Sequence, residues 1–119
     1  MLDLTHLKLC VDVARVELIS YWEIWYERCY DAIAMDRPRC VVDVGANIGA
    51  FSLYHAMVKH AELVITFEPS PQVFPRLAKN VEINGSKNVR VVNAAVGDKQ
   101  GVLSFSEGRK SINVYAAVQ

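Results

Sequence analysis

Residues 41 to 49 read Val-Val-Asp-Val-Gly-Ala-Asn-Ile-Gly, and they set the architecture that the rest of the chain can adopt. The nearly continuous apolar run over 40–44 is typical of a strand buried on both faces of a parallel sheet. Gly45 allows a tight turn and the close approach of a ligand, and Gly49 allows a helix to pack closely on the strand. A buried strand that runs through a glycine turn into a helix predicts an α/β fold with a ligand crevice above the strand ends.

The segments that follow continue this alternation of helix and strand. Apolar residues over 51–58 recur at the spacing of one helical face, and residues 63–67 form a second β-rich run. A second helix is predicted from about Pro75 to a stop at 84–85, and residues 89–92 form a third strand. The order strand, helix, strand, helix, strand predicts a parallel sheet with right-handed crossovers.

The N-terminal stretch has a different pattern. Residues 2–35 contain no Gly or Pro and mix apolar with charged side chains, which predicts helix. Trp22, Trp25 and Cys29 fit one stripe of such a helix, and two tryptophans so close together usually indicate packing. A cap-like role for the two tryptophans over a binding site is the alternative.

Further short strands are predicted over 102–105 and 112–118, after a turn. We therefore divide the chain into an N-terminal helical segment, 1–38, and a partial α/β domain, 39–119.

Composition narrows the functional classes. The chain has 119 residues, of which 52% are hydrophobic, so one packed domain is feasible. Thirteen basic residues balance thirteen acidic ones, which gives no electrostatic reason to expect nucleic acid or an anionic membrane surface as a partner.

The sequence also gives no sign of a metal site or of a signal for export. Its three cysteines are scattered without a CxxC pair, and its three histidines form no ligand cluster with them, so we expect neither a disulfide framework nor a metal site. Charges interrupt the apolar residues near the N-terminus, so we expect no signal peptide and no membrane span. The expected location is the cytoplasm.

Two polar residues point to the kind of ligand. Asn47 stands where the dinucleotide pattern G-x-G-x-x-G would place its second glycine, which disfavours a nicotinamide cofactor. Glu68 directly follows the second predicted strand and can accept bonds from both hydroxyls of a ribose. The alternative is a surface carboxylate before a proline turn. In either case we expect Glu68 to lie in a turn outside the core, where its loss leaves folding nearly intact.

Two weaker signals accompany them. The small residues Asn93, Ala94 and Ala95 follow the third predicted strand and could line an adenine pocket. Asp43 lies inside an otherwise apolar strand, where a carboxylate needs partners. It could hold the glycine turn, or it could receive the ammonium group of a cofactor that carries an amino acid.

Four segments together resemble the FkbM family of methyltransferases. They are VVDVGANIGAFS, ITFEPSP, LAKNVEINGSKNVRVVNAAVGDKQG and VLSFSEG, and the match runs from about Val41 to about Phe105. The first two are specific in this order and spacing. The resemblance implies the Rossmann-like fold of class I methyltransferases and S-adenosylmethionine as the cofactor. It also implies O-methylation of a small hydroxylated molecule, such as a macrolide or a sugar.

The resemblance assigns cofactor-binding roles residue by residue. The glycine motif should face the methionine end of the cofactor, Glu68 should bind the ribose with Pro69 shaping the turn beside it, and the third strand end should flank the adenine. The complete set is Asp43, Gly45, Ala46, Asn47, Gly49, Glu68, Pro69, Asn93, Ala94 and Ala95.

The chain departs from the family pattern at its end. In the family an acidic segment, typically Asp-Val-Glu-Gly, follows the fourth strand near the transferring methyl group, and no such segment occurs before Gln119. The resemblance therefore implies a truncated fold that holds the cofactor half and lacks the acceptor pocket. We predict no catalytic residue in this chain, and we do not expect this length alone to methylate.

Two other functions stay open at the level of sequence. One is a non-catalytic Rossmann-like binding or interaction domain, and the other is a dehydrogenase fragment, against which Asn47 argues. The identity of the methyl acceptor cannot be read from the residues.

Truncation also bears on assembly. In the family's sheet the fourth strand pairs with the first, so the run 40–44 would become a sheet edge that invites another strand. Residues 112–118 could fold back over this edge, the N-terminal helices could cover it, or two chains could pair there. We predict the last, a homodimer or higher oligomer.

Overall fold

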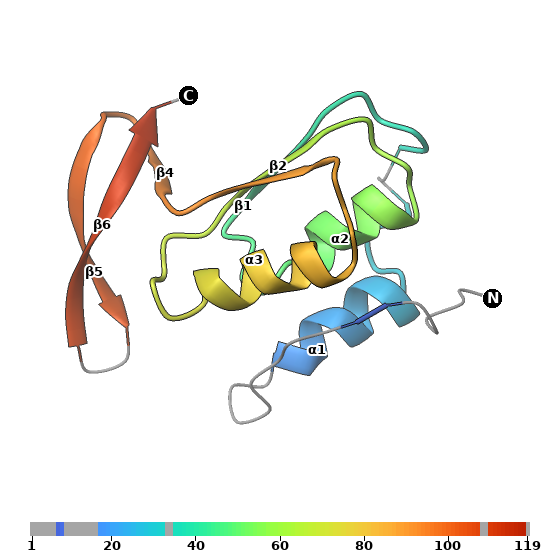
Figure 1. Cartoon of the computed structure of the whole chain (residues 1–119), viewed down its shortest axis with the longest axis horizontal. Helices are drawn as coiled ribbons and strands as arrows, with labels where there is room; N and C mark the ends of the chain where they lie inside the picture. Colours follow the sequence, from blue (N-terminus) through green and yellow to red (C-terminus); the bar gives the residue numbers. More distant parts are fainter. Residues whose placement is uncertain (1–6, 9–16, 33–34, 108–109, 119) are drawn as a thin grey trace.

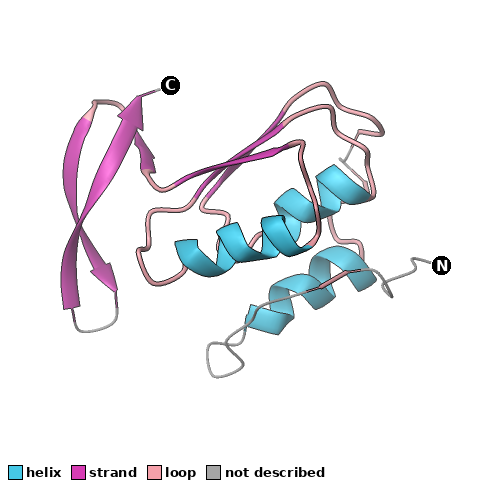
Figure 2. Cartoon of the chain, in the orientation of Figure 1, coloured by secondary structure: helices cyan, strands magenta, loops and turns pink. Residues whose placement is uncertain are grey.

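The described residues form two small sheets, with a stack of helices on one side of the first sheet (Figure 1). The computed structural model describes residues 7–8, 17–32, 35–107 and 110–118. Figure 2 distinguishes its helices from its strands. In chain order the elements are α1 (Glu17–Tyr21), the π-helix η2 (Trp22–Tyr26), β1 (Val41–Val44), α2 (Ala50–Met57), β2 (Val64–Phe67), α3 (Phe74–Ile83), β3 (Val89–Val92), β4 (Ala95–Gly97), β5 (Gly101–Glu107) and β6 (Lys110–Val118).

The first sheet is parallel and has the strand order β1-β2-β3. Val41 pairs with Val64, which pairs with Val89, so the three strands run in step and their carboxyl ends meet at one edge of the sheet. The predicted alternation of strands and helices is confirmed. Among the described strands β1 also takes the expected place at the end of the sheet.

Both α2 and α3 cover the same face of this sheet (Figure 1). On that face Val64 and Thr66 of β2 are fully buried, and so is Leu77 of α3. The opposite face carries Val42 and Val44, which are 48% and 57% exposed. The expectation that β1 is buried on both faces is therefore wrong, because no described helix covers its second face.

The second predicted helix begins and ends as its Pro and Gly residues indicate. Pro75 lies in the first turn of α3, where a backbone N–H is not needed. Asn84 caps the other end, Gly85 follows with a φ of +63°, and the Ser86 N–H donates to the Val81 carbonyl at 3.2 Å. These contacts satisfy carbonyls of the last turn and confirm the predicted stop.

Among the described residues the N-terminal helical region ends earlier than the sequence predicts. Its described helices are α1 and η2, which end at Tyr26, and Leu7 and Lys8 belong to neither helix nor strand. Arg28 adopts a left-handed φ of +56°, which ends the helix well before Pro38. Nowhere in the described ranges does a helix have the length and apolar character needed to cross a membrane. The parts of the predicted helix that lie outside the described residues are 2–6, 9–16 and 33–34.

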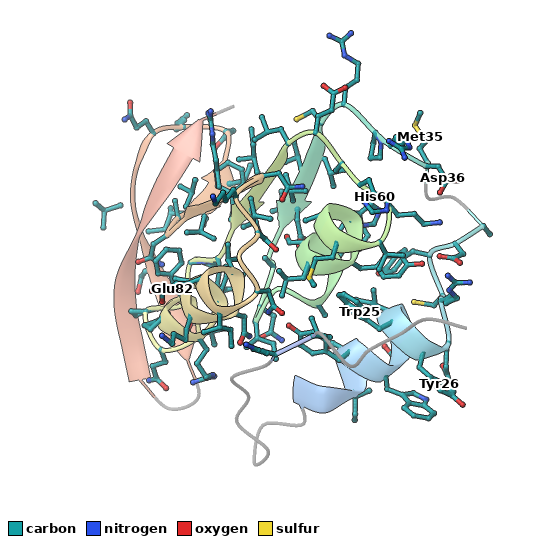
Figure 3. The ribbon with its side chains drawn as sticks, turned by 45° about the vertical axis from the view of Figure 1, so that its right-hand side comes forward. Trp25, Tyr26, Met35, Asp36, His60 and Glu82 are labelled. Carbon is teal, nitrogen blue, oxygen red and sulfur yellow. The ribbon has the colours of Figure 1, made fainter. Side chains whose placement is uncertain are left out.

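One face of this helix packs on α2, and only one of the two tryptophans belongs to that face. Tyr21 and Trp25 stand one turn apart and are buried, with Trp25 between the two helices (Figure 3). Trp22 lies on the outer face, 54% exposed, and its ring stacks on that of Tyr26 at a centroid distance of 4.1 Å. The predicted stripe is wrong for Trp22 and Cys29, which are exposed. Trp22 follows the buried Tyr21 and so falls on another helix face, whereas Cys29 lies in the turn after η2 has ended.

The same helix shares a core with the α/β part of the chain. Tyr21, Ile24 and Trp25 form one apolar cluster with Ile48 and Leu53. The division at residue 38 stays a prediction, and the apolar cluster extends across it.

The last three strands form a second sheet with the order β4-β6-β5. Strands β5 and β6 are an antiparallel hairpin, which confirms the two predicted C-terminal strands. Strand β4 was not predicted; it pairs in parallel with β6, with Ala95 opposite Ala116. Because β6 is paired on both sides within this sheet, it does not cover β1.

Gly49 sets how closely α3 can approach the turn before α2. Its φ is +96°, and a Cβ built on it would lie 2.8 Å from Cδ1 of Leu77. The close packing that we expected between helix and strand is therefore packing against α3.

We expect Gly49→Ala to destabilise the fold more than Gly85→Ala. Gly85 has a comparable φ of +63° but nothing within 4 Å of its Cβ position. Gly85→Ala therefore measures only the cost in stability of a left-handed alanine, about 1–2 kcal/mol. Gly49→Ala adds overpacking against Leu77, on the order of 1–3 kcal/mol. Urea unfolding measures both variants, and equal losses would show that Leu77 yields without cost.

Candidate functional site

The glycine turn is fixed to the end of β2 by its backbone. The N–H groups of Gly45 and Ala46 both donate to the Phe67 carbonyl at 2.9 Å. Gly45 has a φ of +75°, and Asn47 has a φ of +54°, a left-handed conformation that Asn tolerates better than most residues. No atom lies within 4 Å of a Cβ built on Gly45, so one side of the turn is open to a ligand.

The buried side chain of Glu68 holds this turn by hydrogen bonds to backbone N–H groups. Its Oε2 accepts a bond from the Asn47 N–H at 2.8 Å, and its Oε1 accepts one from the Ser70 N–H at 2.8 Å. The residue is only 7% exposed, so the expectation of a turn carboxylate outside the core is wrong. Burial is tolerated because two backbone dipoles meet the charge, and each oxygen keeps a lone pair for a further donor.

The end of β3 is tied to the same corner. The Asn93 side-chain amide donates to the Glu68 carbonyl at 2.8 Å and lies 3.4 Å from the Pro69 carbonyl. Ala94 beside it is buried, and Ala95 begins β4. The site residues predicted at the ends of β2 and β3 therefore lie side by side. The Asn93 amide, however, is bonded to the backbone of the turn after β2.

Asp43 points from β1 toward α2. Its Oδ2 accepts a bond from the Ser52 hydroxyl at 2.6 Å, and that hydroxyl lies 2.9 Å from Oγ1 of Thr66. Burial raises the pKa of Asp43, while the Ser52 bond and the nearby His55 offset part of the rise. Asp43 thus joins β1 to α2 rather than bonding the glycine turn, and a contact with an ammonium group stays a prediction.

A cavity of about 420 Å³ opens on the β1 side of the glycine turn. Four of the ten predicted residues line it, namely Asp43, Gly45, Ala46 and Asn47. The other six lie outside it: Gly49 is packed against α3, and the rest lie at the ends of β2 and β3, namely Glu68, Pro69, Asn93, Ala94 and Ala95.

Sequence reasoning missed one wall of this cavity. Ser20 and Ile24 of the N-terminal helix and Tyr30 of the following turn line it as well. No motif marks these residues, because they reach the cavity only through the packing of the helix on α2. The buried stripe that contains Trp25 was the one available signal.

A polar cluster holds the turn that carries Tyr30. The hydroxyl of Tyr54, a buried residue of α2, donates a hydrogen bond to Asp31, and Lys59 Nζ lies 3.7 Å from the same carboxylate. The Tyr54 bond lowers the pKa of Asp31, and burial together with that bond raises the pKa of Tyr54 to about 12. Tyr30 itself packs edge-to-face on Phe51 at 5.1 Å.

Within the described part of the chain, no group of three or more His, Cys, Asp or Glu side chains is arranged to hold a metal ion.

We expect Glu68→Ala to destabilise the fold substantially. The change leaves the N–H groups of Asn47 and Ser70 without their acceptor, at about 1.5–3 kcal/mol for each bond. Glu62→Ala is the matched control, since Glu62 is exposed and its loss should change stability by less than about 0.5 kcal/mol. Chemical denaturation of both variants gives the comparison, and equal stabilities would mean that these bonds contribute nothing.

Comparison with known proteins places this geometry in a family, although no protein-family model matches the chain. The chain is 40% identical over 84 residues to the 31-O-demethyl-FK506 methyltransferase FkbM of Streptomyces tacrolimicus, a match that covers 69% of this chain and 32% of that protein. It is 32% identical over 87 residues to the methyltransferase sdnD of Sordaria araneosa, covering 72% and 34%.

The fold has solved counterparts too. The crystal structure of TYW2 from P. horikoshii in complex with MeSAdo matches with a TM-score of 0.52 and 25% identity, over 74% of this chain and 30% of that one. The chain spans about a third of the length of the curated methyltransferases that it matches. By its strand order, its glycine turn and these relatives, the chain belongs to the FkbM-like family of S-adenosylmethionine-dependent methyltransferases.

Proposed function

We propose that this chain binds S-adenosylmethionine and forms the donor-binding part of an O-methyltransferase that acts on a small hydroxylated molecule or a sugar. The observation that carries the proposal is the open glycine turn, held by a buried carboxylate at the carboxyl ends of three parallel strands. One relative's name includes O-demethyl, which supports an oxygen as the methyl acceptor.

The residues present fit the cofactor. The open side of Gly45 admits a ligand against the backbone, and Asp43 and Asn47 offer polar groups on the cavity wall beside it. Glu68 would accept bonds from the ribose hydroxyls, with Pro69 shaping the turn next to it. The third strand end, Asn93, Ala94 and Ala95, would flank the adenine.

Bound S-adenosylmethionine supplies an electrophilic methyl group on a sulfonium. The role of this chain's residues is to bind and orient that donor, because transfer needs the acceptor oxygen in line with the sulfonium carbon. Since the chain spans about a third of its relatives' length, we assign the acceptor contacts and any general base to no residue here.

Two alternatives compete with this proposal. A non-catalytic binding or interaction domain would share the fold and need not bind the cofactor. A dinucleotide site is disfavoured because the Asn47 side chain occupies the position at which a glycine would admit a pyrophosphate.

We expect S-adenosylhomocysteine to bind more tightly than NAD in calorimetric titrations. Gly45→Ala should weaken S-adenosylhomocysteine binding at least about tenfold, because the methyl group enters the space that the ligand needs. Gly85→Ala is the matched control, since it introduces a comparable left-handed strain far from the cavity and should leave the affinity unchanged. Tighter binding of NAD, or equal effects of the two variants, would refute the proposed site.

We also propose that two copies of the chain associate along β1. This strand ends the first sheet, and the exposed Val42 and Val44 accompany its open edge. Light scattering after size exclusion, at several concentrations, should give the mass of a dimer or larger. A monomer at every concentration, with strongly protected amides over 41–44, would show that the chain covers its own edge.

A further inference from the structure

We propose that Asn84 is a site of spontaneous deamidation, and that the reaction releases the Leu7–Lys8 segment, which this side chain holds against the end of α3. Asn84 directly precedes Gly85, whereas each of the other asparagines is followed by isoleucine, valine or alanine. Glycine leaves the next backbone nitrogen unhindered, and that nitrogen is the nucleophile in deamidation. Cofactor binding plays no part in this reaction.

The Asn84 side chain pairs with the main chain of Lys8 through both of its polar atoms. Its Oδ1 accepts a bond from the Lys8 N–H at 2.9 Å, and its Nδ2 donates to the Lys8 carbonyl at 2.6 Å. The same Nδ2 donates to the Asn80 carbonyl within α3 at 2.7 Å. Leu7 packs against the apolar cluster that the N-terminal helix shares with α2. The amide therefore fastens the segment next to the point at which Leu7 meets the core.

The reaction consumes only water and changes no oxidation state. The Gly85 nitrogen forms a bond to Cγ of Asn84 and gives up its proton to base, while the amide group of Asn84 leaves as ammonia. The product is a five-membered succinimide. Water then opens the ring at Cγ, which gives aspartate, or at the main-chain carbonyl, which gives isoaspartate and routes the chain through the side chain.

The folded structure holds these groups apart. Asn84 has a ψ of −2°, so the Gly85 nitrogen is nearly eclipsed with the Asn84 nitrogen and is turned away from the Cβ that carries the amide. The Gly85 N–H also donates to the Glu82 carbonyl at 3.0 Å. Ring closure therefore requires the end of α3 to open and the Asn84 amide to leave Lys8.

Such an opening is local. Asn84 is partly exposed, and its bonds to Lys8 lie at the surface, where water competes for both partners. No atom lies within 4 Å of a Cβ built on Gly85, so the backbone has room to rotate there. Helix ends open at a lower free energy than the core does, so the rate of deamidation reports this opening rather than global unfolding.

The product no longer fits its partners. A carboxylate has no donor, so an aspartate at this position keeps the Lys8 N–H but sets an oxygen against the carbonyls of Lys8 and Asn80, where Nδ2 now donates. Its negative charge also lies at the helix C-terminus, where the helix dipole disfavours it. Two lost bonds and these repulsions outweigh the one bond that remains, and isoaspartate further lengthens the main chain at the cap.

The first test compares two substitutions of Lys8 in the full chain. Lys8→Pro removes the N–H that Asn84 accepts, whereas Lys8→Ala keeps the main chain and removes only the side chain. During incubation in mildly alkaline buffer, we expect Lys8→Pro to deamidate at Asn84 at least about fivefold faster than the wild type, and Lys8→Ala to stay within about twofold. Chromatography and mass spectrometry of the peptide that contains residues 84–85 give the rates.

Leu7→Ala, which weakens the packing of the segment on the core, serves as the second variant if Lys8→Pro does not fold, as judged by its thermal transition. The wild type should also deamidate at Asn84 at least about tenfold more slowly when folded than when unfolded in urea. Equal rates in the folded and unfolded chain, or equal rates for Lys8→Pro and Lys8→Ala, would show that the segment does not protect Asn84.

The second test measures the release itself. Asn84→Asp reproduces one product, and we expect it to speed hydrogen exchange of the Lys8 amide at least about fivefold. Asn88→Asp is the matched control, because the Asn88 amide donates to the carbonyls of Ala56 and Ala61 and does not contact the segment; it should leave that exchange unchanged. If Asn84→Asp has no effect on the Lys8 amide, or if both variants speed its exchange equally, deamidation does not release the segment.

Discussion

The carboxylate of Glu68 is the junction on which the candidate site depends. It accepts one backbone N–H from the glycine turn after β1 and another from the turn after β2, and it is almost fully buried while doing so. A buried charge is tolerated only where donors surround it, so the two turns must keep the geometry that presents those donors. Asn47, whose N–H donates one of these bonds, adopts a positive φ of +54° within the turn.

The fold arranges other polar atoms around the same constraint. The carbonyl of Ile48 accepts bonds from Tyr21 and Asn80, and the Asn93 amide bonds the backbone carbonyl of Glu68. These backbone carbonyls of the two turns are thereby bonded to side chains of α1, of α3 and of the residue after β3. They do not depend on solvent for partners. A site of this kind is organised before the ligand arrives, which lowers the entropic cost of binding.

Sequence predicted the features that short-range rules determine. The apolar runs marked β1, β2 and β3, and Gly85 marked the end of α3, because strand patterns and left-handed turns are encoded within a few residues. The features that were missed depend on partners far along the chain. Ala95 becomes a strand residue only by pairing with Ala116, and the burial of Glu68 depends on the N–H of Asn47.

The same distinction explains the candidate site. Asp43, Gly45 and Asn47 could be assigned to it because motif residues lie together in sequence, whereas Ser20 and Tyr30 could not. The two tryptophans show why. Trp22 and Trp25 are the same residue type, so a hydrophobicity pattern cannot tell which of them is buried. Only the direction from which α2 packs makes one of them structural and leaves the other exposed.

The bonds from the N-terminal helix to the glycine turn couple two parts of the chain that sequence alone would separate. Trp25 and Tyr21 donate to carbonyls at the start of α2, so a displacement of the helix must either break these bonds or carry the turn with it. Breaking the Trp25 bond would leave its buried indole N–H without this acceptor, at about 1–3 kcal/mol. Movement of helix and turn together is the less costly course. Whatever contacts the exposed face of the helix, at Trp22 and Tyr26, therefore acts on the same rigid unit that lines the cavity.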